Sequence, residues 1–121
     1  MIVQVHHTVH NKLTGNPEGH EHIANVFITG TPININTALE YAYRWTQNLD
    51  GSWSMGPDIS HQGELYDNTD YNPAVEVVKP LRTWSDGREM GHRSSMMYDR
   101  MIVDGITYEV SAFGFHEMEI A

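Results

Sequence analysis

Apolar and polar residues alternate at the start of the chain. The apolar set of this alternation is Val3, Val5, His7 and Val9, and a period of two residues is typical of a half-buried strand. The next stretch, residues 11–19, is rich in turn-forming residues, and apolar residues return before Thr29. We therefore predict a long hairpin over residues 2–29.

Residues 36–49 carry the pattern of an amphipathic helix. Leu39, Ala42, Tyr43 and Thr46 recur at helical spacing. Asn34 or Asn36 can cap its first turn, and the Gly at position 51 can terminate it. A helix with so broad an apolar face is expected to pack on a sheet or on a second copy of itself.

The rest of the chain divides into a loop and a run of short strands. Residues 52–72 show no period and are expected to form a long loop, which is either functional or an ordinary flexible surface loop. Residues 74–119 contain short apolar runs, and Asp104-Gly105 lies between two of them as a tight hairpin turn. The pattern predicts a single domain over residues 1–121. Its fold is expected to be α+β, with a mostly antiparallel sheet of about six or seven strands and one main amphipathic helix.

Charge is distributed unevenly along the sequence. The 121 residues include sixteen acidic and seven basic side chains, for a formal net charge of −9. A uniformly acidic surface repels long nucleic acids, so we expect no such partner. Five of the seven basic residues lie between positions 79 and 100: Lys79, Arg82, Arg88, Arg93 and Arg100. That segment is expected to bind a small anion.

Several protein classes are excluded or disfavoured. The chain has no cysteine, which excludes disulfides, thiolate catalysis and cysteine-based zinc sites. It has no apolar run of the 18–20 residues that a membrane span needs. Its first residues lack the basic start and apolar core of a signal peptide. We therefore expect a cytosolic protein without a membrane partner.

The segment Gly91–Ser95 has the residue types of a phosphate site. Glycine permits close approach of the backbone, and Arg93, Ser94 and Ser95 supply a guanidinium fork and two hydroxyls. The flanking residues Arg82, Trp84 and Phe113 add a cation and aromatic faces on which a base can stack. The alternative is an ordinary solvated turn.

Histidines suggest two further kinds of chemistry. The predicted hairpin contains His6, His7, His10, His20 and His22, which form either a metal site or a solvated polar face. In addition, His6-His7-Thr8 and His92-Arg93-Ser94 both have the form His-x-Thr/Ser. Two such motifs are typical of two-histidine phosphoesterases, in which one histidine is the base and the other the acid. We expect neither a metal ion nor another cofactor.

The order of several short motifs resembles a known family. The residues that carry the resemblance lie within about residues 36–118: Thr46-Gln47-Asn48, Asp50-Gly51-Ser52-Trp53-Ser54, Asp70-Tyr71-Asn72-Pro73, Arg93-Ser94-Ser95 with Asp99, Val103-Asp104-Gly105 with Tyr108, and Gly114-Phe115. The chain is similar in these motifs to small phage proteins that include the first-described Thoeris anti-defence sponge.

The resemblance implies a fold, a function and a place of action. Such sponges are α+β proteins that bind cyclic ADP-ribose signals in the host cytoplasm and hold them without cleavage, and some also capture cyclic oligonucleotides. The resemblance implies a homo-oligomer, a dimer or hexamer, formed through the helix around Tyr41 and Trp45. The family segment reads Arg-Ser-Thr-Ser-Val-Gly-Asp, whereas this chain has Met96 in place of a serine and Tyr98 in place of the glycine. The backbone path and the ligand are therefore expected to differ in detail.

The leading hypothesis is a non-enzymatic protein that sequesters a cyclic nucleotide. Arg93, Ser94 and Ser95 would bind phosphate, Asn72 and Asp99 would read the ribose or adenine edges, and a base would stack on Tyr66, Trp84 or Phe113. No catalytic residue is required. Two alternatives come from other classes: a phosphodiesterase that uses His6 and His92, and a phage structural or interaction module without a small ligand.

Overall fold

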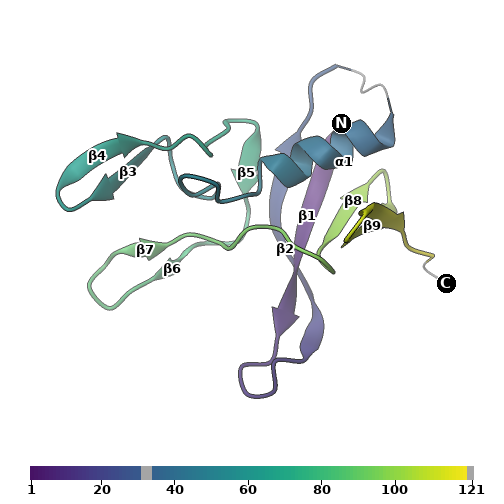
Figure 1. Ribbon diagram of the computed structural model, residues 1–121, viewed down its shortest axis with the longest axis horizontal. Helices are drawn as coiled ribbons and strands as arrows, with labels where there is room; N and C mark the ends of the chain where they lie inside the picture. The colour runs from purple at the N-terminus through teal and green to yellow at the C-terminus, as the bar shows by residue number, and fades with distance from the viewer. Residues whose placement is uncertain (31–33, 120–121) are drawn as a thin grey trace.

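A six-stranded antiparallel sheet forms the body of the molecule (Figure 1). In the computed structural model, which describes residues 1–30 and 34–119, the strand order is β10-β9-β8-β1-β2-β5. The strands are β1 (Ile2–His10), β2 (Pro17–Phe27), β5 (Val75–Val77), β8 (Arg100–Val103), β9 (Ile106–Ser111) and β10 (Gly114–Glu117). With the helix described below, this architecture confirms the predicted α+β class and the mostly antiparallel sheet.

Strands β1 and β2 form the long hairpin at the centre of this sheet. Their register runs from Ile2 opposite Phe27 to His10 opposite Pro17, with irregularities after Val5 and after Thr8. The first irregularity leaves Ile23 of β2 without a partner on β1, and Ile23 and its neighbour Ala24 are both buried. On β1, His7 continues the buried alternation of Val3 and Val5, and Thr8 is buried as well, against Tyr98 and Asp99. The hairpin therefore buries polar groups near its middle, which must find partners inside the protein.

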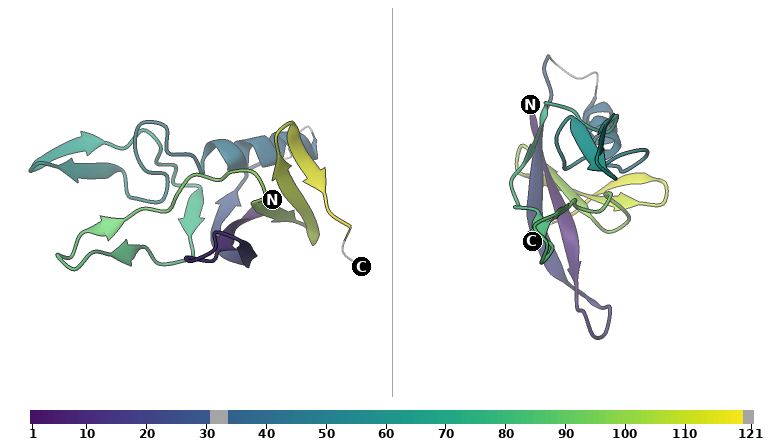
Figure 2. Two further views of the ribbon diagram at one scale, coloured as in Figure 1. Left: turned by 60° about the horizontal axis from the view of Figure 1, so that its bottom comes forward. Right: turned by 90° about the vertical axis from the view of Figure 1, so that its left-hand side faces the viewer.

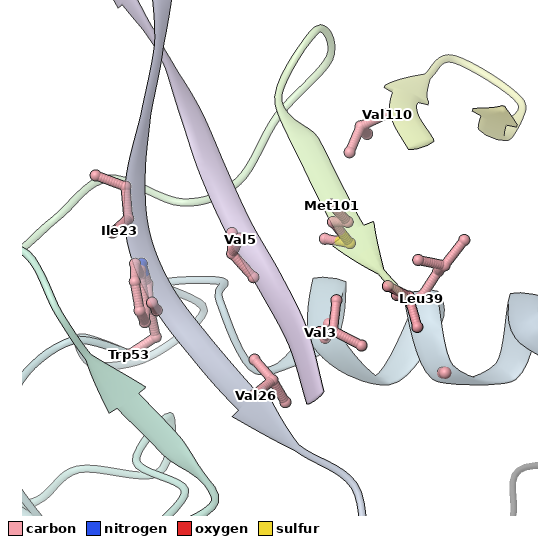
Figure 3. Close-up of a cluster of buried hydrophobic side chains, with 12 residues drawn as sticks. Val3, Val5, Ile23, Val26, Leu39, Trp53, Met101 and Val110 are labelled. Carbon is pink, nitrogen blue, oxygen red and sulfur yellow. The ribbon is translucent and has the colours of Figure 1, made fainter. Parts of the chain in front are cut away.

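Helix α1 (Ile35–Arg44) packs on one face of the sheet (Figure 2). The Asn34 side chain caps its first turn by accepting a hydrogen bond from the Thr37 amide at 2.9 Å. The helix buries Ala38, Leu39 and Ala42. Figure 3 shows the core that results, which combines Leu39 of the helix with apolar side chains from several strands and from the segment after the helix: Val3, Val5, Ile23, Val26, Trp53, Met101 and Val110.

The helix ends at Arg44, so the predicted end at residue 49 is wrong. Continuing the helix would tie the amides of Asn48 and Leu49 to carbonyls one turn back. Instead, the Asn48 amide donates to Ser94 Oγ at 2.8 Å, and the Leu49 amide donates to the Asp70 carboxylate at 2.8 Å. These tertiary partners redirect the chain after the C-cap residue Trp45.

The predicted loop over residues 52–72 is not continuous, so this prediction is wrong as well. These residues contain the hairpin of β3 (Asp58–His61) and β4 (Glu64–Asp67). Its turn residues Gln62 and Gly63 both have positive φ angles, 53° and 81°, as a two-residue hairpin turn requires. The sequence pattern misses these strands because both faces are largely solvent-exposed, so no apolar alternation marks them.

A second small hairpin lies within the predicted strand region. Strands β6 (Arg82–Thr83) and β7 (Glu89–Met90) pair with each other and do not join the main sheet. Figures 1 and 2 show that this hairpin and β3–β4 both project from the same side of the body. The Asp104-Gly105 turn joins β8 to β9 with φ angles of 50° and 78°, as predicted. Within the described parts of the chain, no helix has the length and apolarity needed to cross a membrane.

Candidate functional site

A cavity of about 370 Å³ opens beside the middle of the β1–β2 hairpin. Its walls come from β1, β2, the base of the β6–β7 hairpin with the segments that flank it, and Asn48 after the helix, and its volume lies in the range of small-molecule sites. Three of the seven basic residues line it: Lys79, Arg82 and Arg93. Glu21 is the one carboxylate among the described residues that line it. Three of the five basic residues of the 79–100 segment therefore line one cavity.

The three cations reach the cavity from different parts of the backbone. Lys79 follows β5, where its amide donates to the Ile23 carbonyl at 3.1 Å, and its ammonium group pairs with Glu21. Arg82 begins β6 and is exposed. Among the described residues, Arg82 forms no ion pair with a carboxylate. Its charge is therefore the most available of the three to a ligand.

Arg93 is held in place by a bidentate pair with Asp99. The two guanidinium nitrogens lie 2.7 and 2.8 Å from the carboxylate oxygens, and Asp99 is 1% exposed. The same carboxylate accepts from the amides of Thr8 and Met96, each at 2.8 Å. Burial by itself raises the pKa of Asp99, but the hydrogen bonds from Arg93 and Thr8 lower it further than burial raises it, so the net pKa is below its ordinary value.

The Arg93–Asp99 pair also completes the edge of β1. Strand β8 pairs with β1 only from Gln4 to His6, so the backbone groups of Thr8 lack a strand partner on that side. Asp99 accepts from the Thr8 amide, and Arg93 donates to the Thr8 carbonyl at 3.2 Å. The pair thus satisfies buried backbone groups as a neighbouring strand would. Four of the five guanidinium N–H groups of Arg93 are used inside the protein.

The two serines of the predicted phosphate segment bind other parts of the protein. Ser95 is 2% exposed, and its hydroxyl lies 3.0 Å from His7 Nε2 and 2.7 Å from Thr46 Oγ1. Ser94 Oγ accepts from the Asn48 amide. Neither serine lines the cavity. In the structure they fix the 91–99 segment to the end of helix α1.

Two histidines line the cavity next to these groups. Burial lowers the pKa of His7 to about 4, although the Asp99 carboxylate at 3.8 Å opposes the shift; His7 is therefore neutral near neutral pH. His92 Nε2 lies 2.8 Å from the Lys79 carbonyl, and its ring lies 6.0 Å from that of Trp53. The indole N–H of Trp53 donates to the Arg93 carbonyl at 2.8 Å. These contacts give the cavity a well-anchored wall.

The structure does not bring His6 and His92 to one site. His6 stacks on His22 across the hairpin, with ring centroids 4.8 Å apart, and does not line the cavity that contains His92. Burial and the nearby His22, His20 and Arg100 lower the pKa of His6 to about 4. Across residues 1–30 and 34–119, no three His, Asp or Glu side chains are grouped as a metal site requires.

The remaining predicted ligand-binding residues lie outside this cavity. Trp84 lines a neighbouring cavity of about 610 Å³ between the two projecting hairpins. Tyr66 is exposed on β4, where its hydroxyl donates to Glu64 at 2.8 Å. Phe113 is fully exposed in the turn between β9 and β10. Asn72 donates to the Tyr41 hydroxyl at 2.9 Å, next to the helix.

Sequence reasoning missed Glu21 and Asn48, which also line the cavity. Asn48 belongs to one of the motifs that carry the resemblance, but no ligand-binding role was predicted for it, and no local motif marks Glu21. Both reach the cavity only through the pairing of β1 with β2 and the early end of helix α1. Comparisons of the chain with protein-family models, with curated proteins and with solved structures found no match.

Proposed function

We propose that this protein binds a cyclic nucleotide signal of the cyclic ADP-ribose type through its phosphates and holds it without cleavage. The observation that carries the proposal is the convergence of Lys79, Arg82 and Arg93 on one small cavity. The chain as a whole has a formal charge of −9, so this cavity is a local exception to an acidic molecule. Charges further away than about 8 Å are largely screened at physiological salt, so a small ligand in the cavity responds mainly to these neighbours.

The cavity suits binding better than catalysis. Arg93 is immobilised by Asp99 before any ligand arrives, which reduces the side-chain entropy lost on binding. Arg82 supplies a planar fork of donors that matches phosphate geometry. His7 already shares its Nε2 with Ser95 and is shielded by burial. Tight sequestration needs only this kind of preorganised, charged surface.

The base of the ligand belongs, in this proposal, on Trp84. Arg82 and Trp84 are two residues apart at the β6–β7 hairpin, or about 7 Å along an extended strand, and they line neighbouring cavities. Trp84 is half exposed, so a planar base can stack on its indole. The ligand would then extend along β6, with its phosphates at Arg82 and its base at Trp84.

The backbone at Tyr98 supports the resemblance on which the ligand class rests. Tyr98 has a φ of 74°, a left-handed conformation that favours glycine, and the resembling family has glycine at this position. The Tyr98 amide donates to the Val110 carbonyl at 2.9 Å, and its carbonyl accepts from Thr8 Oγ1 at 3.0 Å. These bonds hold Tyr98 in the left-handed conformation that a glycine would adopt freely at this position.

The proposal includes a homo-oligomer assembled through the outer side of helix α1. Tyr41 is partly exposed there, with its ring 6.4 Å from that of Trp45, and the Arg44 guanidinium lies 4.2 Å from the Trp45 ring. An aromatic and arginine surface of this kind is typical of interfaces. Sedimentation of the purified protein tests this part: a dimer or hexamer supports it, and a monomer at high concentration contradicts it.

Recovery of the ligand distinguishes sequestration from hydrolysis. The protein is incubated with cyclic ADP-ribose, free ligand is removed, and the protein is denatured by heat. Release of intact cyclic ADP-ribose supports the proposal. Release of a linear product contradicts it and favours the phosphodiesterase. Absence of both binding and a thermal shift contradicts it in favour of an interaction module.

A further inference from the structure

Glu21 forms an ion pair with Lys79, one of the three cations that a phosphate ligand would use. Its carboxylate accepts a hydrogen bond from the Lys79 ammonium group, and both residues line the 370 Å³ cavity. The side chains are 39% and 34% exposed, respectively, so solvent and solutes reach the pair. Glu21 therefore lies where an anionic ligand and Lys79 would meet.

The backbone fixes both members of this pair at the cavity wall. Glu21 is on β2 directly opposite His7 of β1, which itself lines the cavity. The amides of Val78 and Lys79 both donate to the carbonyl of Ile23, two residues beyond Glu21 on the same strand. The backbones of β2 and the Lys79 segment are thus joined next to the ion pair. Only the two flexible side chains have to move to open it.

We infer that Glu21 is a specificity-determining residue: a built-in competing anion that a ligand must displace from Lys79. The inference rests on the proposed function, because it concerns the same cavity. Glu21 would select among ligands by their number of phosphate charges. A ligand with a single phosphodiester charge exchanges one anion for another at Lys79 and gains little there. A ligand with two adjacent phosphate charges can replace Glu21 at Lys79 and also engage Arg82.

The environment of the other cations supports this role. Arg93 keeps its own buried carboxylate, Asp99, whose four hydrogen bonds make displacement unfavourable. Glu21, by contrast, has Lys79 as its one side-chain partner among the described residues and is partly solvated. Exposed or half-exposed ion pairs contribute weakly to stability. Glu21 is therefore the anion in this cavity that a ligand can displace most easily.

Glu21→Gln tests the inference, with Glu117→Gln as the matched control. Glu117 lies on β10 at the opposite edge of the sheet from β5 and does not line the cavity. Binding of cyclic ADP-ribose, which has two phosphate charges, and of cyclic AMP, which has one, is measured by calorimetry on each variant. We expect Glu21→Gln to bind cyclic ADP-ribose about two- to fivefold more tightly than the unmodified protein does, from the loss of one competing ion pair.

Cyclic AMP provides the readout that a structural role would not produce. We expect its binding to tighten by a larger factor than that of cyclic ADP-ribose, so that Glu21→Gln discriminates less between the two ligands. Glu117→Gln should leave both affinities unchanged. Thermal unfolding accompanies the titrations: Glu21→Gln should be no more stable than the unmodified protein, which separates tighter binding from a better fold.

The outcomes separate the inference from the proposed function. If the unmodified protein binds cyclic ADP-ribose and Glu21→Gln binds it equally or more weakly, the inference is overturned and the proposed function stands. Unchanged discrimination between the two ligands overturns the selection by charge. If neither protein binds either ligand, the proposed function fails, and the inference fails with it.

Discussion

Replacing Asp99 with Asn removes a charge from the centre of the hydrogen-bond network. The carboxylate accepts two hydrogen bonds from Arg93 and one each from the amides of Thr8 and Met96. An amide has a similar shape but offers one acceptor oxygen and two N–H donors. The new NH2 group therefore faces at least one N–H donor of Arg93 or of the backbone, at a position where the side chain is 1% exposed.

The magnitude follows from the burial of the two partners. Breaking a buried ion pair by removing one partner costs about 3–5 kcal/mol. Arg93 is 36% exposed and can regain part of its hydration, so we expect Asp99→Asn to lower the free energy of unfolding by about 2–4 kcal/mol. Urea unfolding near neutral pH measures this loss. The control variant Asp50→Asn, at an exposed position, should lower the free energy of unfolding by less than about 0.5 kcal/mol.

The dependence on pH provides a second test of the same network. Because the folded state lowers the pKa of Asp99, its stabilising contribution is present above the unfolded pKa of about 4 and is lost as the pH falls through the lower folded value. The difference between the Asp99→Asn variant and the unmodified protein should therefore shrink on strong acidification. A loss below about 1 kcal/mol at neutral pH, or a difference independent of pH, would refute this account.

Two further predictions concern neighbouring residues. His7 has a folded pKa of about 4, so the unfolded state takes up its proton first and stability should fall by up to about 3 kcal/mol as the pH drops from about 6.5 to 4. In His7→Gln, the free energy of unfolding measured with urea should depend less on pH in that window, although His6 still contributes part of the dependence. An unchanged pH dependence would contradict the lowered pKa of His7. Tyr98→Gly should leave stability unchanged within about 0.5 kcal/mol or raise it, because glycine adopts its positive φ freely. Met97→Gly, at an exposed position without positive φ, should lose about 0.5–1 kcal/mol. Urea unfolding of both glycine variants measures the difference, and equal losses would contradict this interpretation.

The elements that sequence predicted best are those with local physical signals. Alternating valines mark β1, and Asp104-Gly105 marks the β8–β9 turn, because period and positive φ are properties of a few neighbouring residues. The helix end could not be predicted from local pattern, since the acceptors that redirect Asn48 and Leu49 are Ser94 and Asp70, distant in sequence.

The candidate site was predictable in part. The cluster of cations in the sequence led to Arg82 and Arg93, both of which line the cavity. The sequence could not reveal that Asp99 engages the Arg93 guanidinium, or that Ser95 faces His7. Both contacts depend on how the 91–99 segment folds against β1. A residue type suited to phosphate binding is equally suited to internal hydrogen bonds, and only the tertiary structure decides between them.

Calorimetric titration of cyclic ADP-ribose into the Arg82→Ala variant tests the central claim most directly. Arg82 lines the cavity and has no ion-pair partner among the described residues, so its loss removes an interaction with phosphate and little else. We predict saturable binding to the unmodified protein and affinity about 10- to 100-fold weaker in Arg82→Ala, as expected for a charge-assisted hydrogen bond of about 1.5–3 kcal/mol. Lys12→Ala, in the turn between β1 and β2, should bind like the unmodified protein. Equal affinity in Arg82→Ala and the unmodified protein would contradict the account.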